Sequence, residues 1–402
     1  MTKVPEAGFV CLLLFAAVSP LCGQAQRRPN EYGPTRGATT VPSLVSPEVH
    51  ADRRITFRMR APKATEVLLS LSGAGAGPRQ MTKDANGVWS ITVGPLEPEI
   101  YTYSFSVDGM RMLDMRNPIL KNGRAPDASV VEVGGNPPRF DELQNTPHGA
   151  IHIRTYMSTP LRRYRKLYVY VPPQYDSEPR RRFPVLYLRH GSGDNEANWS
   201  EDGRAGVILD NLLSQRKAVP MLIVMPNGDT DSTWAGGSSP QAMDLLEKEV
   251  MTDILPMIEK NYRVLTGPAN RAIAGLSMGG GQAFTIGLRN LDKFAWVGQF
   301  SSGLVSDKQF DLRKHLPGLL EQGTANSKKL RLLFLSCGTE DPRYNGQRNL
   351  VDLLKENKLR PYWFEISGAH EWKVWRHSLA EFLQLAFQPA SLPRLRELLP
   401  MP

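Results

Sequence analysis

Residues Arg271 to Gln282 read RAIAGLSMGGGQ. The apolar run over 272–274 predicts a short buried strand, GLSMG over 275–279 is a G-x-S-x-G motif, and a helical pattern follows. A strand, a sharp turn and a helix in this order are typical of the nucleophile elbow of an α/β-hydrolase. Because the strained turn leaves no room for a Cβ two positions before or after the serine, both positions are glycine. The stretch therefore predicts that Ser277 is a nucleophile.

Two backbone segments are candidates for an oxyanion hole. The helix that begins beside Ser277 points N–H groups and the positive end of its dipole at a developing negative charge. In this fold one donor is the N–H of the residue after the nucleophile, here Met278, and the other comes from the loop after an early strand. The sequence LRHGSG over 188–193 follows a predicted strand and fits that loop, because its glycines let the backbone approach a substrate closely.

The order of the triad in this fold is serine, acid, histidine, so the base must follow Ser277. Three of the seven histidines do so: His315, His370 and His377. His370 comes directly after a predicted late strand, on a loop where a catalytic base belongs. His315 precedes every suitable acid, and His377 falls inside the last helical pattern. We therefore expect His370 to be the base.

The acid is expected in the loop CGTEDP over 337–342, at the end of a predicted strand. A carboxylate there would hold the imidazole in the required tautomer and stabilise the imidazolium that forms on proton transfer. Glu340 and Asp341 both qualify by position.

The start of the chain is typical of a signal peptide over residues 1–25, with Lys3, an apolar run over 8–18 and a small-residue cleavage site at 23–25. No later run approaches the roughly 20 apolar residues that a membrane span needs. Removal of the leader would leave Cys337 alone, so no internal disulfide is expected. These features predict a secreted or periplasmic bacterial protein.

The net charge of +9 comes from short basic groups interleaved with acidic residues. This pattern indicates a solvated basic surface, and attraction to acidic polysaccharide or the cell envelope is the alternative. No nucleic-acid-binding motif accompanies the charge.

Changes in composition and periodicity along the chain indicate linkers, two domains and a tail. Residues 26–46, rich in Pro, Gly, Thr and Arg, predict a linker. Over 47–133, short alternating runs separated by Asn-Gly and Asp-Gly turns predict a small β-sandwich. A second linker is expected over 134–147, and strands alternate with helices over 148–388, which indicates an α/β domain with a largely parallel central sheet. The last segment, 389–402, contains four prolines and predicts a loosely attached tail.

The predicted elements follow from hydrophobic periodicity. Strands are expected at 55–59, 66–70, 88–93, 101–107, 166–171, 184–188, 221–225, 272–275, 296–300, 330–336 and 362–366, and helices at 243–261, 278–289, 347–357 and 374–386.

Five stretches in this order resemble carbohydrate esterase family one, which contains feruloyl and acetylxylan esterases. They are LRHGSGDNEANW (188–199), RAIAGLSMGGGQ (271–282), NLDKF (290–294), CGTED (337–341) and GAHEWKVW (368–375). Enterochelin esterases and bacterial mycolyltransferases are more distant relatives. The likeness covers residues 147–387 and implies an α/β-hydrolase fold. Residues 47–133 resemble the early-set, immunoglobulin-like domain, related to glycogen-binding modules, that often precedes such esterases.

The resemblance also implies individual roles. In that family the acid is the last residue of a G-T-x-D loop, which falls on Asp341. The nucleophile falls on Ser277 and the base on His370. The oxyanion amides fall on Met278 and on the residue after His-Gly, Ser192.

One position departs from the family, because Arg189 stands where an apolar residue is usual before His-Gly. Three tryptophans, Trp199, Trp234 and Trp372, are candidates to line an aromatic acyl pocket. Packing beside the site is the alternative for each of them.

Together these features predict a serine esterase that needs neither a metal nor an organic cofactor. The resemblance implies an acyl group, feruloyl or acetyl, on a plant polysaccharide such as xylan, so the expected partner is a polysaccharide or oligosaccharide ester. The alternatives are an enterochelin-type siderophore esterase, a catalytically inactive carbohydrate-binding protein, and acyl transfer to a sugar in place of water.

Overall fold

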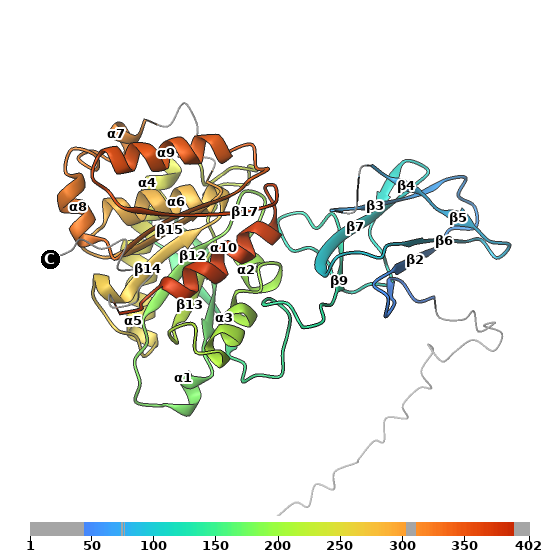
Figure 1. Cartoon of the computed structure of the whole chain (residues 1–402), viewed down its shortest axis with the longest axis horizontal. Coiled ribbons are helices and arrows are strands. Elements are labelled where there is room, and N and C mark those ends of the chain that lie inside the picture. Colours follow the sequence, from blue (N-terminus) through green and yellow to red (C-terminus); the bar gives the residue numbers. More distant parts are fainter. Residues whose placement is uncertain (1–43, 74, 76, 303–310, 390–402) are drawn as a thin grey trace, which may run out of the picture. The chain divides into compact units, whose positions relative to one another are not determined.

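The computed structural model describes residues 44–73, 75, 77–302 and 311–389 (Figure 1). The predicted signal peptide, nearly all of the first linker and nearly all of the tail lie outside these residues. Within the described part of the chain, none of the helices has both the length and the apolar character needed to cross a membrane.

Two antiparallel sheets occupy residues 48–133. One has the strand order β1 (Glu48–Val49), β2 (Ile55–Arg60), β6 (Val88–Val93), β5 (Thr82–Lys83). The other has the order β4 (Arg79–Gln80), β3 (Val67–Leu71), β7 (Glu99–Val107), β8 (Met110–Met112), and β9 (Ser129–Val133) also pairs with β7. The four strands predicted in this region are present, with ends that differ by one or two residues.

These sheets share one apolar core, because alternate side chains along each strand point to the same face of the sheet. Along β3, Val67, Leu69 and Leu71 are buried, and the residues between them are partly exposed. They join Phe57 of β2 and Trp89 of β6 in a single cluster. The core therefore draws on strands of both sheets.

Residues 150–366 contribute a mixed sheet of eight strands. Its order is β10 (Ala150–Ser158), β11 (Arg163–Val171), β13 (Leu222–Pro226), β12 (Val185–Arg189), β14 (Arg271–Gly275), β15 (Trp296–Phe300), β16 (Leu332–Gly338), β17 (Pro361–Ile366). The six strands from β13 to β17 are parallel to one another, and β11 pairs antiparallel with both of its neighbours. The expected largely parallel sheet thus has an antiparallel edge. Strand β10, whose Ile151 and Ile153 face solvent at this edge, was not predicted.

The helices lie between and after these strands. They are α1 (Gln174–Ser177), α2 (Asn198–Glu201), α3 (Ala205–Ser214), α4 (Pro240–Glu249), the π-helical turn η1 (Val250–Ile254), α5 (Leu255–Asn261), the 3₁₀ turn η2 (Pro268–Asn270), α6 (Ser277–Arg289), α7 (Leu312–His315), α8 (Gly323–Lys329), α9 (Tyr344–Glu356) and α10 (Trp372–Leu385). The helix predicted over 243–261 is present as α4, η1 and α5. Pro256 has no N–H to donate to the preceding turn, which explains the local π-helical geometry.

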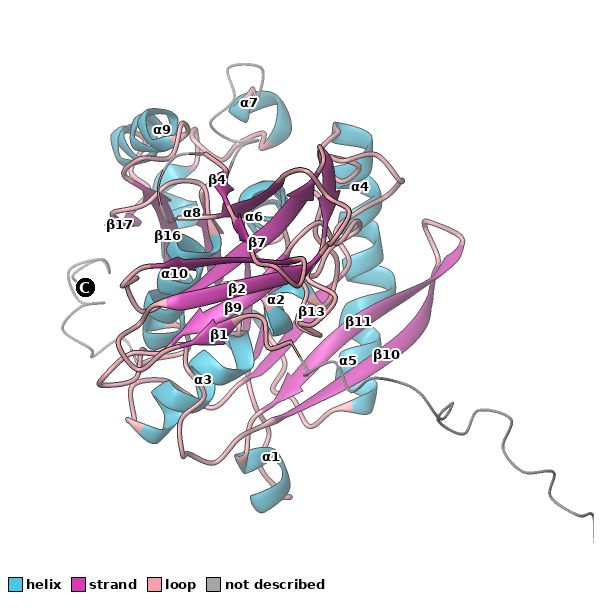
Figure 2. Cartoon of the chain, turned by 90° about the vertical axis from the view of Figure 1, so that its right-hand side faces the viewer, coloured by secondary structure: helices cyan, strands magenta, loops and turns pink. Residues whose placement is uncertain are grey.

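The parallel strands are buried on both faces, so they are continuous apolar runs. Val185 and Tyr187 of β12 belong to a cluster that also contains residues of α4, α5, α6 and α9. Leu186 and Leu188 belong to a second cluster with residues of α3 and α10. Helices therefore cover both faces of the sheet (Figure 2).

The strand order reverses beside β12, since β13 lies on one side of it and β14 on the other. In sheets of this kind, a crevice opens outside the carboxyl ends of the strands at such a reversal. The loop after β12 and the turn after β14 therefore meet there, and these are the two segments predicted to hold the oxyanion hole and the nucleophile.

Candidate active site

The turn after β14 has the strained geometry predicted for a nucleophile elbow. Ser277 has a φ of 68°, a left-handed value that a side chain rarely adopts, and it is the first residue of α6. A Cβ on Gly275 would lie 2.4 Å from the carbonyl oxygen of Gly279, and one on Gly279 would lie 2.3 Å from that of His190. The predicted need for glycine on both sides of the serine is confirmed.

Three predicted side chains come together at the carboxyl ends of β14, β16 and β17. His370 Nε2 lies 3.0 Å from Ser277 Oγ, and His370 Nδ1 lies 2.6 Å from Asp341 Oδ2. The second candidate acid, Glu340, accepts a hydrogen bond from Ser367 Oγ at an exposed position instead. Of the two acids left open by position, the structure joins only Asp341 to the histidine.

The environment of Asp341 keeps it ionised. Burial by itself would raise the pKa of Asp341, but hydrogen bonds from His370 and from the backbone N–H of Arg343 outweigh burial and lower it. The Arg343 N–H donates to Oδ1 at 2.9 Å, so each carboxylate oxygen has its own donor. An ionised Asp341 accepts from Nδ1–H and leaves Nε2 of His370 free to accept the proton of Ser277.

The loop after β12, residues 190–194, is called the oxyanion loop below. A Cβ on Gly191 would lie 3.5 Å from Ser277 Cβ, so the loop passes directly beside the serine. Ser192 and Ser277 line the same cavity. The N–H of Met278 lies in the first turn of α6, where N–H groups have no acceptor within the helix.

His190 braces the oxyanion loop. Its Nε2 accepts from the Gly228 N–H at 2.7 Å, so the ring proton is on Nδ1, which donates to the Gly191 carbonyl at 2.9 Å. Burial lowers the pKa of His190 to about 3, and the ring is neutral at ordinary pH. His190 therefore supports the backbone and is not a second base.

Arg189, the departure from the family pattern, is fully buried behind this loop. Its Nε donates to Gln282 Oε1 at 2.6 Å, and Gln282 Nε2 donates to the carbonyls of Gly228 and Gly237. Burial lowers the pKa of Arg189 to about 10, so it remains a cation. The arginine thereby links the oxyanion loop to the loop after β13, residues 227–237, which we call the Trp234 loop.

Ser277 and His370 line a cavity of about 860 Å³. Trp234 and Trp372 line it, as does Trp375, whose ring meets that of His370 edge-on at 4.9 Å between centroids. Trp199 does not line it: it is 1% exposed, and its indole N–H donates to the Arg189 carbonyl at 2.8 Å. The expectation for Trp199 is therefore corrected, because its side chain packs in the core.

Sequence reasoning missed two parts of this cavity. Trp375 lies three residues after Trp372 on α10, and helical periodicity places such residues on one face. Residues 95–102 and 121–123, with Ala125 and Asp127, also line the cavity from the N-terminal strands and loops. No local sequence pattern predicts that these N-terminal segments reach the cavity. Among the described residues, no group of three or more His, Cys, Asp or Glu side chains is placed to hold a metal ion.

Comparison with known proteins agrees with this geometry. The model of a family described as "Putative esterase" matches residues 158–385. The chain is 31% identical over 356 residues to an endo-1,4-beta-xylanase/feruloyl esterase of Xylanibacter ruminicola, covering 86% of this chain and 46% of that protein. A second match, to an uncharacterised protein of Corynebacterium glutamicum, covers 55% of that protein at 23% identity. The chain thus spans about half the length of these curated relatives.

Solved structures show the fold. A CE1 ferulic acid esterase from Anaeromyces mucronatus, in complex with ferulic acid, superposes with a TM-score of 0.52 at 24% identity, over 61% of this chain and 93% of that one. The enterobactin esterase of Shigella flexneri superposes with a TM-score of 0.61 at 19% identity, over 84% of this chain and 93% of that one. The neighbours support an α/β-hydrolase-like fold. The chain belongs to this esterase family, a family of carboxylic-ester hydrolases.

Proposed function

We propose that this chain hydrolyses a carboxylic ester through an acyl-serine intermediate. The observation that carries the proposal is the hydrogen-bonded series Ser277, His370, Asp341, of which Ser277 and His370 line the cavity. Ser277 Oγ attacks the acyl carbonyl while His370 Nε2 takes its proton and then gives that proton to the leaving alcohol. Asp341 fixes the tautomer of His370 and stabilises the imidazolium. Water then releases the acid with the same base, and no metal or organic cofactor takes part.

The oxyanion of each tetrahedral intermediate would be held by two backbone donors, the N–H groups of Ser192 and Met278. Both belong to segments beside Ser277, the oxyanion loop and the first turn of α6. The position of these segments at the strand-order reversal supports the assignment.

The proposed substrate is a feruloyl or acetyl ester of a plant polysaccharide such as xylan. The name of the Xylanibacter relative, which is similar over most of this chain, supports this class. The aromatic side chains of Trp234, Trp372 and Trp375 at the cavity suit an aromatic acyl group. We further propose an immunoglobulin-like sandwich at 47–133, a connecting segment at 134–147, an esterase domain at 148–388, and export directed by residues 1–25.

A fluorophosphonate probe tests the chemistry. Wild-type protein is expected to be labelled and Ser277→Ala is not, while Ser72→Ala, which removes another serine lining the cavity, keeps its labelling. An unlabelled wild type would point to a catalytically inactive binding protein.

A substrate panel tests the specificity. We expect kcat/KM to be highest for a feruloylated xylo-oligosaccharide or acetylated xylan, and lower for enterobactin and simple methyl esters. The opposite order for enterobactin would make the chain a siderophore esterase. Mass spectrometry of reactions with added sugar would reveal transfer in place of hydrolysis.

A further inference from the structure

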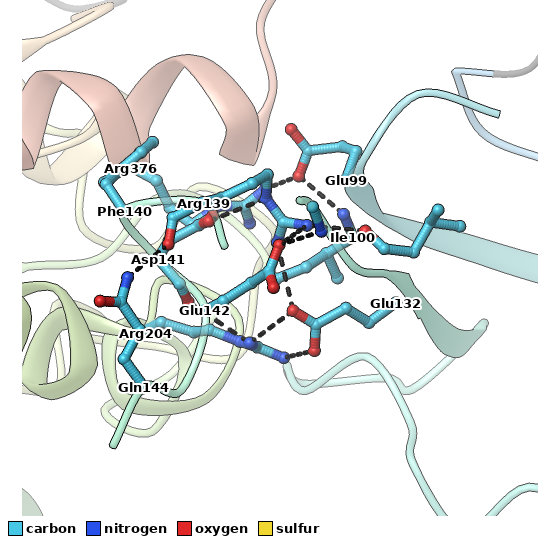
Figure 3. Close-up of polar contacts among 12 residues, drawn as sticks. Glu99, Ile100, Glu132, Arg139, Phe140, Asp141, Glu142, Gln144, Arg204 and Arg376 are labelled. Carbon is cyan, nitrogen blue, oxygen red and sulfur yellow. Dashed lines mark hydrogen bonds and ion pairs between the residues drawn. The ribbon is translucent and has the colours of Figure 1, made fainter. Parts of the chain in front are cut away.

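A network of charged side chains joins the N-terminal strands to the catalytic part of the chain (Figure 3). Arg376 of α10 pairs with Glu99 of β7, and its Nε lies 2.7 Å from Asp141 Oδ2. Glu132 of β9 pairs with Arg204, which precedes α3, at 2.7 Å. The network is completed by contacts of Arg139 with Glu132, Asp141 and Glu142.

Several of these groups are shielded from water. The side chains of Arg376 and Asp141 are 3% and 2% exposed. Ion pairs in such surroundings are weakly screened, and loss of one partner leaves a buried charge. The network therefore holds the N-terminal strands against the catalytic part, and with them the segment Lys121–Arg124 between β8 and β9.

The backbone of that segment contacts the oxyanion loop directly. The Arg124 N–H donates to the Gly193 carbonyl at 3.0 Å. Gly123 lies against the same carbonyl, since a Cβ there would be 3.0 Å from its oxygen, and its φ of 142° also favours glycine. The approach is close enough to restrict where Gly193 can move.

The side chain of Arg124 holds the neighbouring Trp234 loop. Its Nε and Nη2 lie 3.0 and 2.9 Å from Asp229 Oδ2, its Nη2 donates to the Asp231 carbonyl at 2.6 Å, and its Nη1 donates to the Thr233 carbonyl. Asp229 is 4% exposed at its side chain, so the pair is largely withdrawn from water.

The Trp234 loop in turn covers the oxyanion loop. The indole of Trp234 packs on Gly193, where a Cβ would lie 2.2 Å from Cη2. The backbone of Arg124 thus contacts the oxyanion loop directly. Its side chain restricts the same loop indirectly, because it holds the Trp234 loop that packs on Gly193.

We propose that Arg124 is a positioning residue for the esterase reaction, which holds the oxyanion loop where the Ser192 N–H can meet the developing oxyanion. The segment between β8 and β9 therefore supports catalysis, because it carries this residue. The inference rests on the proposed function, since it concerns the oxyanion hole of that reaction.

The expected effect follows from the geometry of such donors. Loss of one oxyanion donor lowers kcat by about 100- to 1,000-fold, and a displacement of about 1 Å can cost about 100-fold. Because Arg124→Ala keeps the backbone contact to Gly193 and removes the hold on the Trp234 loop, we expect kcat to fall by about 10- to 100-fold. KM should change less than about threefold, because the interaction is one made in the transition state.

The experiment compares full-length variants in ester hydrolysis and in fluorophosphonate labelling of Ser277, whose rate also depends on the oxyanion hole. Arg124→Ala should be labelled more slowly, and low, non-denaturing guanidinium chloride should restore part of its kcat. Glu132→Gln is the matched control, since it touches neither loop and leaves the buried pairs of Arg376 with Glu99 and Asp141 in place. It should keep kcat and the labelling rate within about twofold, well short of the loss of a donor.

The outcomes separate the two claims. A wild-type protein that neither hydrolyses esters nor reacts with the fluorophosphonate would refute the proposed function itself. A reactive wild type with Arg124→Ala at the wild-type kcat and labelling rate would overturn the inference alone, as would an equal loss in Glu132→Gln. If Arg124→Ala does not fold, Arg124→Gln decides, because it fills similar space without the charge, and wild-type kcat in that variant would also overturn the inference.

Discussion

Replacement of Asp341 by asparagine should change the tautomer of His370. In the structure Oδ1 accepts from the Arg343 N–H at 2.9 Å and Oδ2 accepts from His370 Nδ1 at 2.6 Å. An asparagine in the same rotamer keeps its carbonyl oxygen on the Arg343 N–H, because only that oxygen can accept there. Its NH₂ then faces Nδ1, which must become an acceptor, and the ring proton moves to Nε2. His370 can no longer accept the proton of Ser277.

The size of the effect can be estimated from that change. A wrong tautomer in a serine–histidine–aspartate triad lowers kcat by about 10⁴-fold, which corresponds to about 5.5 kcal/mol of transition-state stabilisation. KM should hardly change, because Asp341 is buried behind the histidine and contacts no substrate. Stopped-time assays of a chromogenic acetate ester and of methyl ferulate would give both constants.

The matched control is Glu340→Gln, which alters the adjacent carboxylate in the same loop. The exposed Glu340 side chain accepts a hydrogen bond from Ser367 and does not contact His370, so kcat should stay within about twofold, a factor too small to reflect a lost triad member. Two results would refute the reasoning: an Asp341→Asn variant within tenfold of the wild-type kcat, or a Glu340→Gln variant that loses as much.

Three further predictions concern groups around the triad. Gly279→Ala places a methyl 2.3 Å from the His190 carbonyl, where about 3.5 Å is needed, so the loop must move by about 1 Å and kcat should fall by about 100-fold; unchanged kcat in a folded variant would contradict the contact. Burial raises the pKa of the Asp194 carboxyl to about 7, above its value of 3.8 in the unfolded chain. The folded state therefore binds the carboxyl proton more tightly, and the stability that this protonation contributes is lost as pH rises from about 4 to above 7. Asp194→Asn should therefore raise the free energy of unfolding at pH 8 by up to about 4 kcal/mol and have little effect at pH 4, and thermal melts that show equal shifts at both values would exclude this. Trp372→Ala should raise KM for methyl ferulate more than for an acetate ester, because the indole lines the cavity, and equal changes for both esters would place the tryptophan outside the acyl site.

The local motifs predicted most of the catalytic geometry. Ser277 and its two glycines fall within five consecutive residues, so the sequence alone can indicate this turn, although the carbonyl that excludes a Cβ at Gly279 belongs to the distant His190. The strand ends that carry Asp341 and His370 follow from hydrophobic runs and chain order. The choice between Glu340 and Asp341 depends on which side chain turns inward, and spacing does not decide that.

Contacts between distant segments escaped prediction. Arg124 and Asp229 are 105 residues apart, and neither lies in a pattern that names the other. Trp199 was a candidate to line the acyl pocket, but its large ring is buried and its N–H donates to the Arg189 carbonyl. In the edge strand β10, Ile151 and Ile153 alternate with polar residues but face solvent, so alternation does not report burial there.

The network around Arg139, Asp141 and Arg376 has a consequence for engineering. Residues 134–147 have the composition of a flexible tether, and a protein engineer would choose them for cutting or for grafting a new module. Cutting there would expose Arg376 and the Gly193 carbonyl, each of which has a partner in or before this segment. A shortened enzyme would need those partners rebuilt on the catalytic part, and swapping in an unrelated binding module would not supply them.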